Sequence, residues 1–178
     1  MARSNKDIVE FTLIYNRQKV KVFNYVLRMI NDRMMCEDIV QNVFLKLFEN
    51  LSNIRNRSSI NFWLFTTARN EIYTYFRRKK IRVDQFGVAD TDDNDISNDF
   101  DLQIEYERKE LKELILAELD TMAYEQREVF ILKEYAGLSY KEIATIMKID
   151  ENLVKSRLFK TRQKLVNRLG PKILVENN

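Results

Sequence analysis

The sequence contains no histidine, one cysteine, one proline and three glycines among its 178 residues. The absence of histidine excludes catalytic triads with a His base and zinc sites with His ligands. The single cysteine, Cys36, can form neither an internal disulfide nor a cysteine cluster around a metal. Because sheets and phosphate-binding loops depend on turn residues, the shortage of glycine and proline predicts an all-α chain. We therefore expect no catalytic residues, no metal and no cofactor.

Long apolar runs are also missing. None approaches the length of about 20 residues that a membrane-spanning helix needs, and residues 1–6 lead into no signal-type apolar segment. Hydrophobic residues nevertheless make up 45% of the chain, which is enough for an ordinary buried core. We expect a cytoplasmic protein without membrane insertion.

The charges are unevenly distributed along the chain. Residues 1–82 carry 16 basic and 7 acidic side chains, whereas residues 83–107 carry 9 acidic and no basic ones. Because the acidic stretch is poor in aliphatic residues and lacks periodicity, it predicts a disordered tether. We expect two small helical domains, at 5–82 and 104–172, joined by a flexible acidic linker at 83–103.

The segment 137–165 predicts a helix-turn-helix in the second domain. Ser139 followed by Glu142 is a capping box, which marks the start of a first short helix. Residues 148–150 form the expected turn, and Asp150 can cap the helix that follows. Before this segment we expect helices at Ile104–Leu119 and Tyr124–Tyr135, the second closed by Gly137. The spacing of apolar residues predicts both helices, and the preference of glycine for helix C-termini predicts the end of the second.

The second helix of this motif should be amphipathic. Val154, Leu158, Thr161 and Leu165 fall on one stripe at helical spacing. Facing away, with Arg157 and Arg162 at the flanks, are Asn152, Lys155, Ser156, Phe159 and Lys160. Seven Lys or Arg and no acid lie between Lys155 and Lys172, which suits a helix that enters the major groove, although a solvated surface helix has the same pattern. We expect the helix to stop at Gly170–Pro171.

In the first domain we expect helices at Asp7–Tyr15, Lys19–Ile30, Cys36–Leu51 and Ile60–Lys80, with a polar loop over Leu51–Ser59. The third of these has a wide apolar stripe, and its opposite side shows Asp38, Gln41, Asn42 and Leu45. An exposed leucine among an acid and two amides suggests a protein partner, although the spacing alone favours an ordinary solvated face. The fourth has an outer stripe of Thr66, Asn70, Tyr73, Thr74 and Arg77, followed by a basic run to Arg82. Amide, hydroxyl and aromatic groups beside basic ones fit opened nucleic acid, although the basic run could also serve the helix dipole.

Four segments of the chain resemble the extracytoplasmic-function (ECF) sigma factors of bacterial RNA polymerase. They are E-D-I-V-Q-N-V-F-L-K-L at 37–47, F-W-L-F-T-T-A-R-N at 62–70, R-E-V-F-I-L at 127–132, and G-L-S-Y-K-E-I-A through V-K-S-R-L-F-K-T-R-Q-K-L at 137–165. The segments follow the family's order and spacing. The resemblance implies that the first domain holds core RNA polymerase and opens the promoter −10 element, while the second recognises the −35 element.

The resemblance also implies residue roles. Asp38, Gln41, Asn42 and Leu45 would face the polymerase. Contacts to promoter DNA would come from Asn53, Arg57 and Ser58 in the loop, from Asn70, Thr74 and Arg77 on the long helix, and from Asn152, Lys155, Ser156, Arg157, Phe159, Lys160 and Arg162. The chain departs from the family pattern at Asn42, usually Glu, and at Lys148, commonly Gly. The sequence leaves open whether an anti-sigma factor binds.

Two other classes of protein compete with this interpretation. A free-standing helix-turn-helix regulator would carry a ligand or dimerisation domain, which the basic 60–82 helix and the acidic tether do not fit. A helical adaptor that binds only protein has no need of the basic outer face over 150–169.

Overall fold

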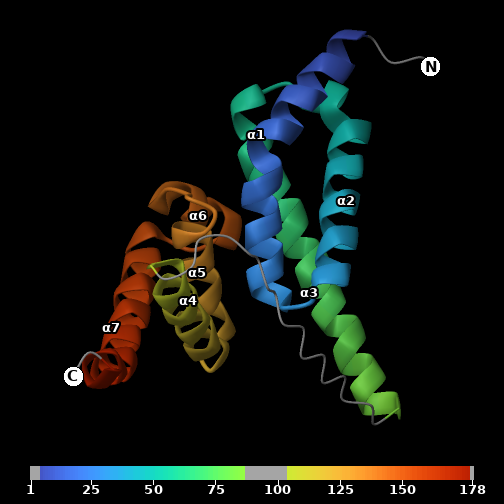
Figure 1. Cartoon of the computed structure of the whole chain (residues 1–178). Helices are drawn as coiled ribbons and strands as arrows, with labels where there is room; N and C mark the ends of the chain where they lie inside the picture. The colour runs from blue at the N-terminus through green and yellow to red at the C-terminus, as the bar shows by residue number, and fades with distance from the viewer. Residues whose placement is uncertain (1–4, 87–103, 177–178) are drawn as a thin grey trace. The chain divides into compact units, whose positions relative to one another are not determined.

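A computed structural model describes residues 5–86 and 104–176, and every regular element within these ranges is helical. The helices belong to two compact units, which we call unit 1 (α1 to α3) and unit 2 (α4 to α7) (Figure 1). The expected all-α class with two small helical domains is confirmed. The expected linker lies outside the described residues from residue 87 onward.

Unit 1 begins with one long helix, α1 (Asn5–Ile30), where two short helices were expected. That expectation was wrong because nothing between Tyr15 and Lys19 breaks a helix, and the apolar stripe continues across the junction. Phe11 and Tyr15 lie on this stripe, and each ring packs edge-on against a ring of α2 (Arg33–Asn50), at centroid distances of 4.9 Å in both pairs.

The three helices α1, α2 and α3 (Ile60–Phe86) pack against one another and share one core. Its fully buried side chains include Val22, Tyr25 and Val26 of α1, Cys36, Val43 and Leu47 of α2, and Leu64, Phe65, Ala68 and Ile72 of α3. Burying each large apolar side chain contributes about 1.5–3 kcal/mol, so this core outweighs any single surface contact of the unit.

Two boundaries in unit 1 differ from the expected ones. Helix α2 starts before Cys36, because the Asp32 carboxylate accepts a hydrogen bond from the Met35 N–H at 3.0 Å and caps the first turn. Helix α3 runs to Phe86, beyond the expected end at Lys80. Between the two helices lie two short 3₁₀ turns, η1 (Leu51–Asn53) and η2 (Arg57–Ser59).

Unit 2 consists of α4 (Ile104–Asp120), α5 (Tyr124–Glu134), α6 (Tyr140–Met147) and α7 (Glu151–Glu176). Helix α7 packs against each of the other three. The buried side chains of these three helices include Leu119 of α4, Val129 and Leu132 of α5, and Ile143 and Ile146 of α6. Gly137 has φ of 70°, the left-handed conformation expected of a residue that closes α5.

The helix-turn-helix is present as predicted in α6, the turn 148–150 and α7. The Ser139 hydroxyl accepts from the Glu142 N–H at 3.2 Å, and the Glu142 carboxylate accepts from the Ser139 N–H at 2.8 Å, so the capping box is complete. The Asp150 carboxylate accepts from the N–H groups of Asn152 and Leu153 at 2.9 and 3.0 Å. These caps fix where α6 and α7 begin.

The expected stop at Gly170–Pro171 was wrong, because α7 continues through Pro171 to Glu176. A proline removes one backbone donor and strains the preceding turn, but it does not prevent the residues after it from staying helical.

Candidate nucleic-acid interface

Helix α7 separates its two faces as the sequence predicts. Val154, Leu158, Thr161 and Leu165 are all buried, while Arg157 at the flank is half-buried. The exposed residues include Asn152, Lys155, Ser156, Phe159, Lys160 and Arg162. Phe159 is the most unusual of them, since 64% of this large apolar side chain is exposed. The face is therefore cationic with one bare aromatic ring, and its contacts to DNA stay a prediction.

One cation of this face is already engaged within unit 2. The Arg162 guanidinium donates to the Glu134 carboxylate of α5, with 2.5 Å between Nη2 and Oε1. This hydrogen bond raises the pKa of Arg162 above its ordinary value. Both side chains are substantially exposed, so the pair can open at small cost to the fold. A phosphate approaching Arg162 would have to compete with Glu134.

A second contact positions Lys155. Its Nζ lies 5.9 Å from the ring centroid of Tyr140, the first residue of α6, and the Nζ of Lys133 lies 4.8 Å from the same centroid. The Lys133 Nζ also donates to the Leu138 carbonyl at 3.2 Å. Two ammonium groups thus lie near one aromatic ring, whose attraction favours a position of the Lys155 ammonium near the start of the helix-turn-helix.

On α3 the expected outer stripe is only partly open. Asn70 and Arg77 are exposed, whereas Thr74 is half-buried and its hydroxyl donates to the Asn70 carbonyl at 2.9 Å. Tyr73 is exposed, and Arg69 lies over its ring at 4.8 Å while donating to its hydroxyl at 2.9 Å. An exposed tyrosine backed by an arginine suits stacking against an unpaired base.

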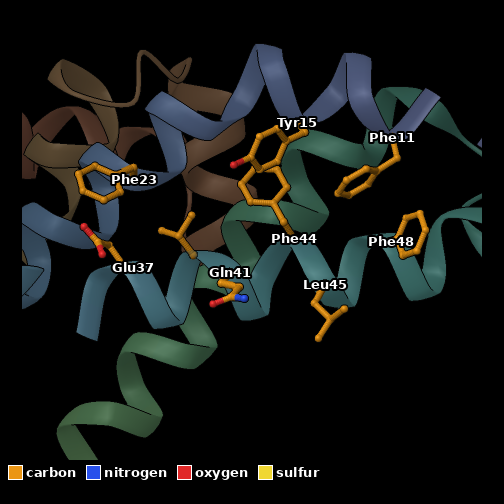
Figure 2. A pocket seen from close by; sticks show the side chains of 9 residues that line it. Phe11, Tyr15, Phe23, Glu37, Gln41, Phe44, Leu45 and Phe48 are labelled. Carbon is orange, nitrogen blue, oxygen red and sulfur yellow. The ribbon is translucent and has the colours of Figure 1, made fainter. Parts of the chain in front are cut away.

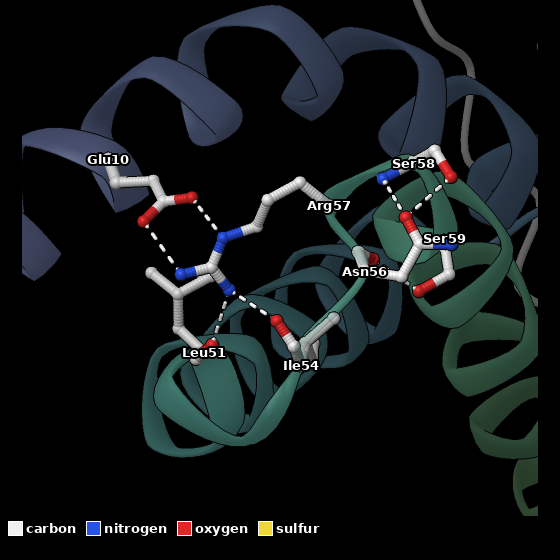
Figure 3. A network of polar contacts seen from close by, with 7 residues as sticks. All are labelled: Glu10, Leu51, Ile54, Asn56, Arg57, Ser58 and Ser59. Carbon is white, nitrogen blue, oxygen red and sulfur yellow. Dashed lines mark hydrogen bonds and ion pairs between the residues drawn. The ribbon is translucent and has the colours of Figure 1, made fainter.

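The loop between α2 and α3 places Asn53, Arg57 and Ser58 at the surface. The side chains of Arg57 and Ser58 nevertheless make hydrogen bonds within unit 1 (Figure 3). The Ser58 hydroxyl donates to the Asn56 amide oxygen at 2.7 Å. The Arg57 guanidinium contacts the Glu10 carboxylate of α1 and two backbone carbonyls. Of the three predicted loop contacts, Asn53 is the one for which the structure gives no such competing role.

The strip on α2 is exposed as predicted. Asp38, Gln41 and Asn42 face solvent, and Leu45 is 53% exposed. Met34, which the sequence interpretation did not include, lies one turn earlier and is 75% exposed. These five residues form what we call the α2 strip, and their polymerase contacts stay a prediction.

An apolar groove adjoins the α2 strip. Figure 2 shows Gln41 and Leu45 at its border, with aromatic rings of α1 and α2 along its wall. The groove has a volume of about 600 Å³, and its rings belong to Phe11, Tyr15, Phe23, Phe44 and Phe48. A partner that covers the α2 strip would meet this apolar surface beside it.

Cys36 lies in the core of unit 1. Burial, aided by the nearby Glu37 carboxylate, raises the pKa of its thiol to about 12, and its Sγ lies 3.6 Å from the Phe23 carbonyl oxygen. Across residues 5–86 and 104–176, no group of His, Cys, Asp or Glu side chains could hold a metal ion. Within the same residues no helix is both long and apolar enough to span a bilayer.

Comparison with known proteins decides the family. Residues 14–81 match the family described as Sigma-70 region 2, and residues 112–165 match Sigma-70, region 4. The ECF RNA polymerase sigma factor SigM of Bacillus subtilis is 30% identical over 154 residues, which span 85% of this chain and 90% of SigM. The chain belongs to the ECF sigma factors.

Two further proteins show how far the likeness extends. The RNA polymerase sigma-H factor of Pseudomonas aeruginosa is 26% identical over 167 residues, covering 90% of this chain and 86% of that protein. The structure is similar to that of the sigma factor RpoE from Bartonella quintana, with a TM-score of 0.70, 24% identity and coverage of 90% and 97%. The chain is a promoter-recognising RNA polymerase sigma factor, as its motifs predicted, and the free-standing regulator is not favoured.

The sequence did not predict the residues that contact and position the candidate surface side chains. Distant contacts are made by Glu10 with Arg57, by Glu134 with Arg162 and by Tyr140 with Lys155, and helical periodicity does not indicate such contacts. Asn56 could have been found, because an asparagine side chain in a turn commonly accepts from the backbone N–H two residues further on. Met34 was missed because the helix was expected to begin two residues after it.

Proposed function

We propose that this sigma factor divides its work between its two units. Residues 5–82 would bind core RNA polymerase and open the −10 element, residues 104–172 would recognise the −35 element, and residues 83–103 would connect them. The observation that carries the proposal is the exposed cationic face of α7, set on a capped helix-turn-helix inside the residues that match Sigma-70, region 4. An exposed basic helix in this position suits the major groove.

In unit 2 the DNA contacts would come from the exposed face of α7. Its N-terminal residues Asn152, Lys155 and Ser156 would meet base edges, since the first residues of a recognition helix enter the groove deepest. Arg157 and Lys160 would meet phosphates on either side. The bare ring of Phe159, exposed on this same face, would offer an apolar contact such as a thymine methyl group.

In unit 1 the α2 strip would contact the polymerase, and the exposed stripe of α3 would contact the opened −10 element. The strip supports this assignment because it joins an acid, two amides and two exposed apolar side chains beside an apolar groove. Asn70 and Arg77 would face DNA from α3. The chain itself would contribute no catalytic group, and the polymerase would make the RNA in the cytoplasm.

An anti-sigma factor is a further proposed partner. The solved RpoE structure is described as a complex with the anti-sigma factor NepR. For this chain the α2 strip and its groove offer a surface that such a partner could cover in competition with polymerase.

The test is transcription by core RNA polymerase from a pool of random promoters, with and without this chain. We expect the chain to select a set of templates that share two short elements at a fixed spacing. A gel-shift experiment with the free chain serves as the comparison, because two small modules on a tether lack a fixed spacing and should bind promoter DNA weakly alone. Tight, sequence-specific binding by the free chain with no effect on transcription would refute the proposal.

A further inference from the structure

Arg57 has almost no donor capacity left for DNA. Its Nε and Nη2 meet the two carboxylate oxygens of Glu10 at 2.5 and 2.9 Å, which is a bidentate pair (Figure 3). Its Nη1 donates to the carbonyls of Leu51 and Ile54 at 2.7 and 2.6 Å. A guanidinium has five N–H donors, so four of them are used inside unit 1. The positive charge is offset by Glu10.

These contacts also solve a structural problem at the end of α2. The last carbonyls of a helix have no partner within the helix and carry the negative end of its dipole. Leu51 is the C-cap residue directly after α2, and its carbonyl accepts from both Arg57 and the Ile54 N–H, the latter at 3.3 Å. Arg57 therefore closes α2 as a C-terminal cation does, but from six residues further along the chain.

The second half of the loop is fixed separately. The Asn56 amide oxygen accepts from the Ser58 N–H at 3.0 Å and from the Ser58 hydroxyl at 2.7 Å, and the Ser59 hydroxyl donates to the Asn56 carbonyl at 2.6 Å. These bonds are all local. The tie that connects the loop to another helix of the unit, among the bonds described, is the one from Arg57 to Glu10, 47 residues away.

We infer that Arg57 is a positioning residue and that Glu10 is its functional partner. Together with the carbonyls of Leu51 and Ile54 they form what we call the Arg57 clamp, which holds the loop 51–59 against α1. The clamp presents Asn53 and Arg55, both exposed, in one fixed arrangement. That this arrangement serves −10 recognition rests on the proposed function, whereas the clamp itself does not.

The clamp and a direct DNA contact by Arg57 predict opposite results for Glu10→Gln. If Arg57 contacts phosphate, loss of the Glu10 charge should free it, and DNA binding should stay the same or tighten. If Arg57 is a clamp, Glu10→Gln should release the loop and act in the same direction as Arg57→Ala. Arg57→Lys adds a second contrast, since it keeps the charge but loses the bidentate geometry.

The first experiment uses the full chain alone and follows trypsin cleavage after Arg55 by mass spectrometry. We expect Glu10→Gln and Arg57→Lys each to speed this cleavage about tenfold, the change in local opening that follows loss of one charge-assisted hydrogen bond. Arg57→Ala removes all four contacts of the guanidinium and should speed it at least as much. The double variant Glu10→Gln with Arg57→Ala should cleave no faster than Arg57→Ala. Asp7→Asn, which removes another acid from α1, is the matched control and should cleave like the wild type.

The second experiment measures promoter binding by the polymerase holoenzyme as a function of salt. The clamp predicts that Glu10→Gln and Arg57→Ala weaken binding by similar factors with an unchanged salt slope, and that both flatten base preference at the same position of the −10 element. A direct phosphate contact predicts a slope lower by about one for Arg57→Ala alone.

The clamp would be overturned if the rate factors of the two single changes multiplied in the double variant, if Glu10→Gln were cleaved like the wild type, or if Glu10→Gln bound promoter more tightly. If the wild-type chain fails to direct polymerase to promoters, the proposed function is refuted. The trypsin comparison still decides the clamp in that case, because it uses neither polymerase nor DNA.

Discussion

The two candidate DNA-contacting surfaces, the exposed face of α7 and the loop 51–59, are built in opposite ways. The α7 face is one continuous helix whose position is set by Asp150 at its start and by a buried stripe along its length. The loop has no regular backbone beyond two short 3₁₀ turns, and its tie to α1 is a pair of side chains 47 residues apart.

The difference predicts how each surface tolerates change. On α7 the exposed side chains can be replaced one at a time, because the backbone beneath them is held by residues that do not face DNA. In the loop, a change to one residue of the Arg57 clamp alters the position of all the others. Mutations on α7 should therefore act locally and additively, whereas mutations in the loop should act as a unit.

The largest expected effect comes from changes in the α2 strip. Asp38→Ala with Leu45→Ala should weaken binding to core polymerase at least about a hundredfold. Burying Leu45 against a partner is worth roughly 1.5–3 kcal/mol, and truncating one side of an interfacial charge pair costs about 2–5 kcal/mol. Pull-down against core enzyme measures the loss.

Two controls make this prediction sharp. Helical content and melting temperature should not change, because Ile39, Val43 and Leu47 carry the packing of α2 and remain in place. Asp7→Ala with Leu13→Ala removes an acid and an exposed leucine from α1 and should leave polymerase binding intact. Full retention of polymerase by the α2 double variant would refute the role of the strip.

The next effect tests whether the α7 face acts locally. Lys155→Ala should weaken promoter binding by about 1–3 kcal/mol and relax preference at one base pair if Lys155 contacts a base. If it contacts only phosphate, the loss should be even across sequences and the salt slope should fall by about one. Lys164→Ala removes the same charge from α7, where Lys164 contacts Gln126, and is the matched control. No change in either affinity or slope would exclude Lys155 from the interface.

Periodicity explains what the sequence could predict about this chain. It placed Val154, Leu158, Thr161 and Leu165 on the buried face of α7, and the structure buries all four. It also predicted correctly which side of α2 is exposed. These are properties of one helix and its own spacing, so one segment of sequence contains the necessary information.

Contacts between distant segments could not be predicted in the same way. Arg57 was expected to meet DNA because the family resemblance places a DNA-contacting loop there, and nothing near it in the sequence indicates Glu10. The same holds for Arg162 and Glu134, which are 28 residues apart. The two wrong helix boundaries have other causes. No residue after Tyr15 breaks a helix, so α1 continues there, and Pro171 does not prevent the residues after it from staying helical.

A smaller effect should come from releasing Arg162 on the α7 face. Glu134→Gln removes the carboxylate that now competes with phosphate, so promoter binding should tighten by about two- to fivefold, the range of an exposed ion pair. The salt slope should rise by up to about one as Arg162 joins the interface. Glu125→Gln removes the same charge from an exposed position of α5 and controls for net charge. Equal gains in both variants would show that Arg162 makes no contact with DNA.

An effect of similar size comes from the turns that join helices in the two units. Both contain a non-glycine residue with left-handed backbone, Asn31 before α2 with φ of 50° and Lys148 before α7 with φ of 57°. In each turn an aspartate, Asp32 or Asp150, then caps the next helix. The left-handed conformation costs most residues about 1–2 kcal/mol, but asparagine adopts it routinely. Unit 2 therefore has strain in its turn that unit 1 avoids.

Replacing the strained residue with glycine should stabilise unit 2. Lys148→Gly relieves the strain but gives the unfolded chain more freedom, which offsets about 0.4–1 kcal/mol, so we expect a net gain of about 0.5–1 kcal/mol. For a domain of this size that gain raises the melting temperature by several degrees. Lys148→Ala removes the same side chain but keeps the Cβ atom, so it should give no gain. Asn31→Gly should give none either, because the strain it would relieve is small.

Thermal unfolding followed by circular dichroism separates these cases. Equal stabilisation by Lys148→Gly and Lys148→Ala would place the cost in the lysine side chain, and the left-handed backbone would not be its source.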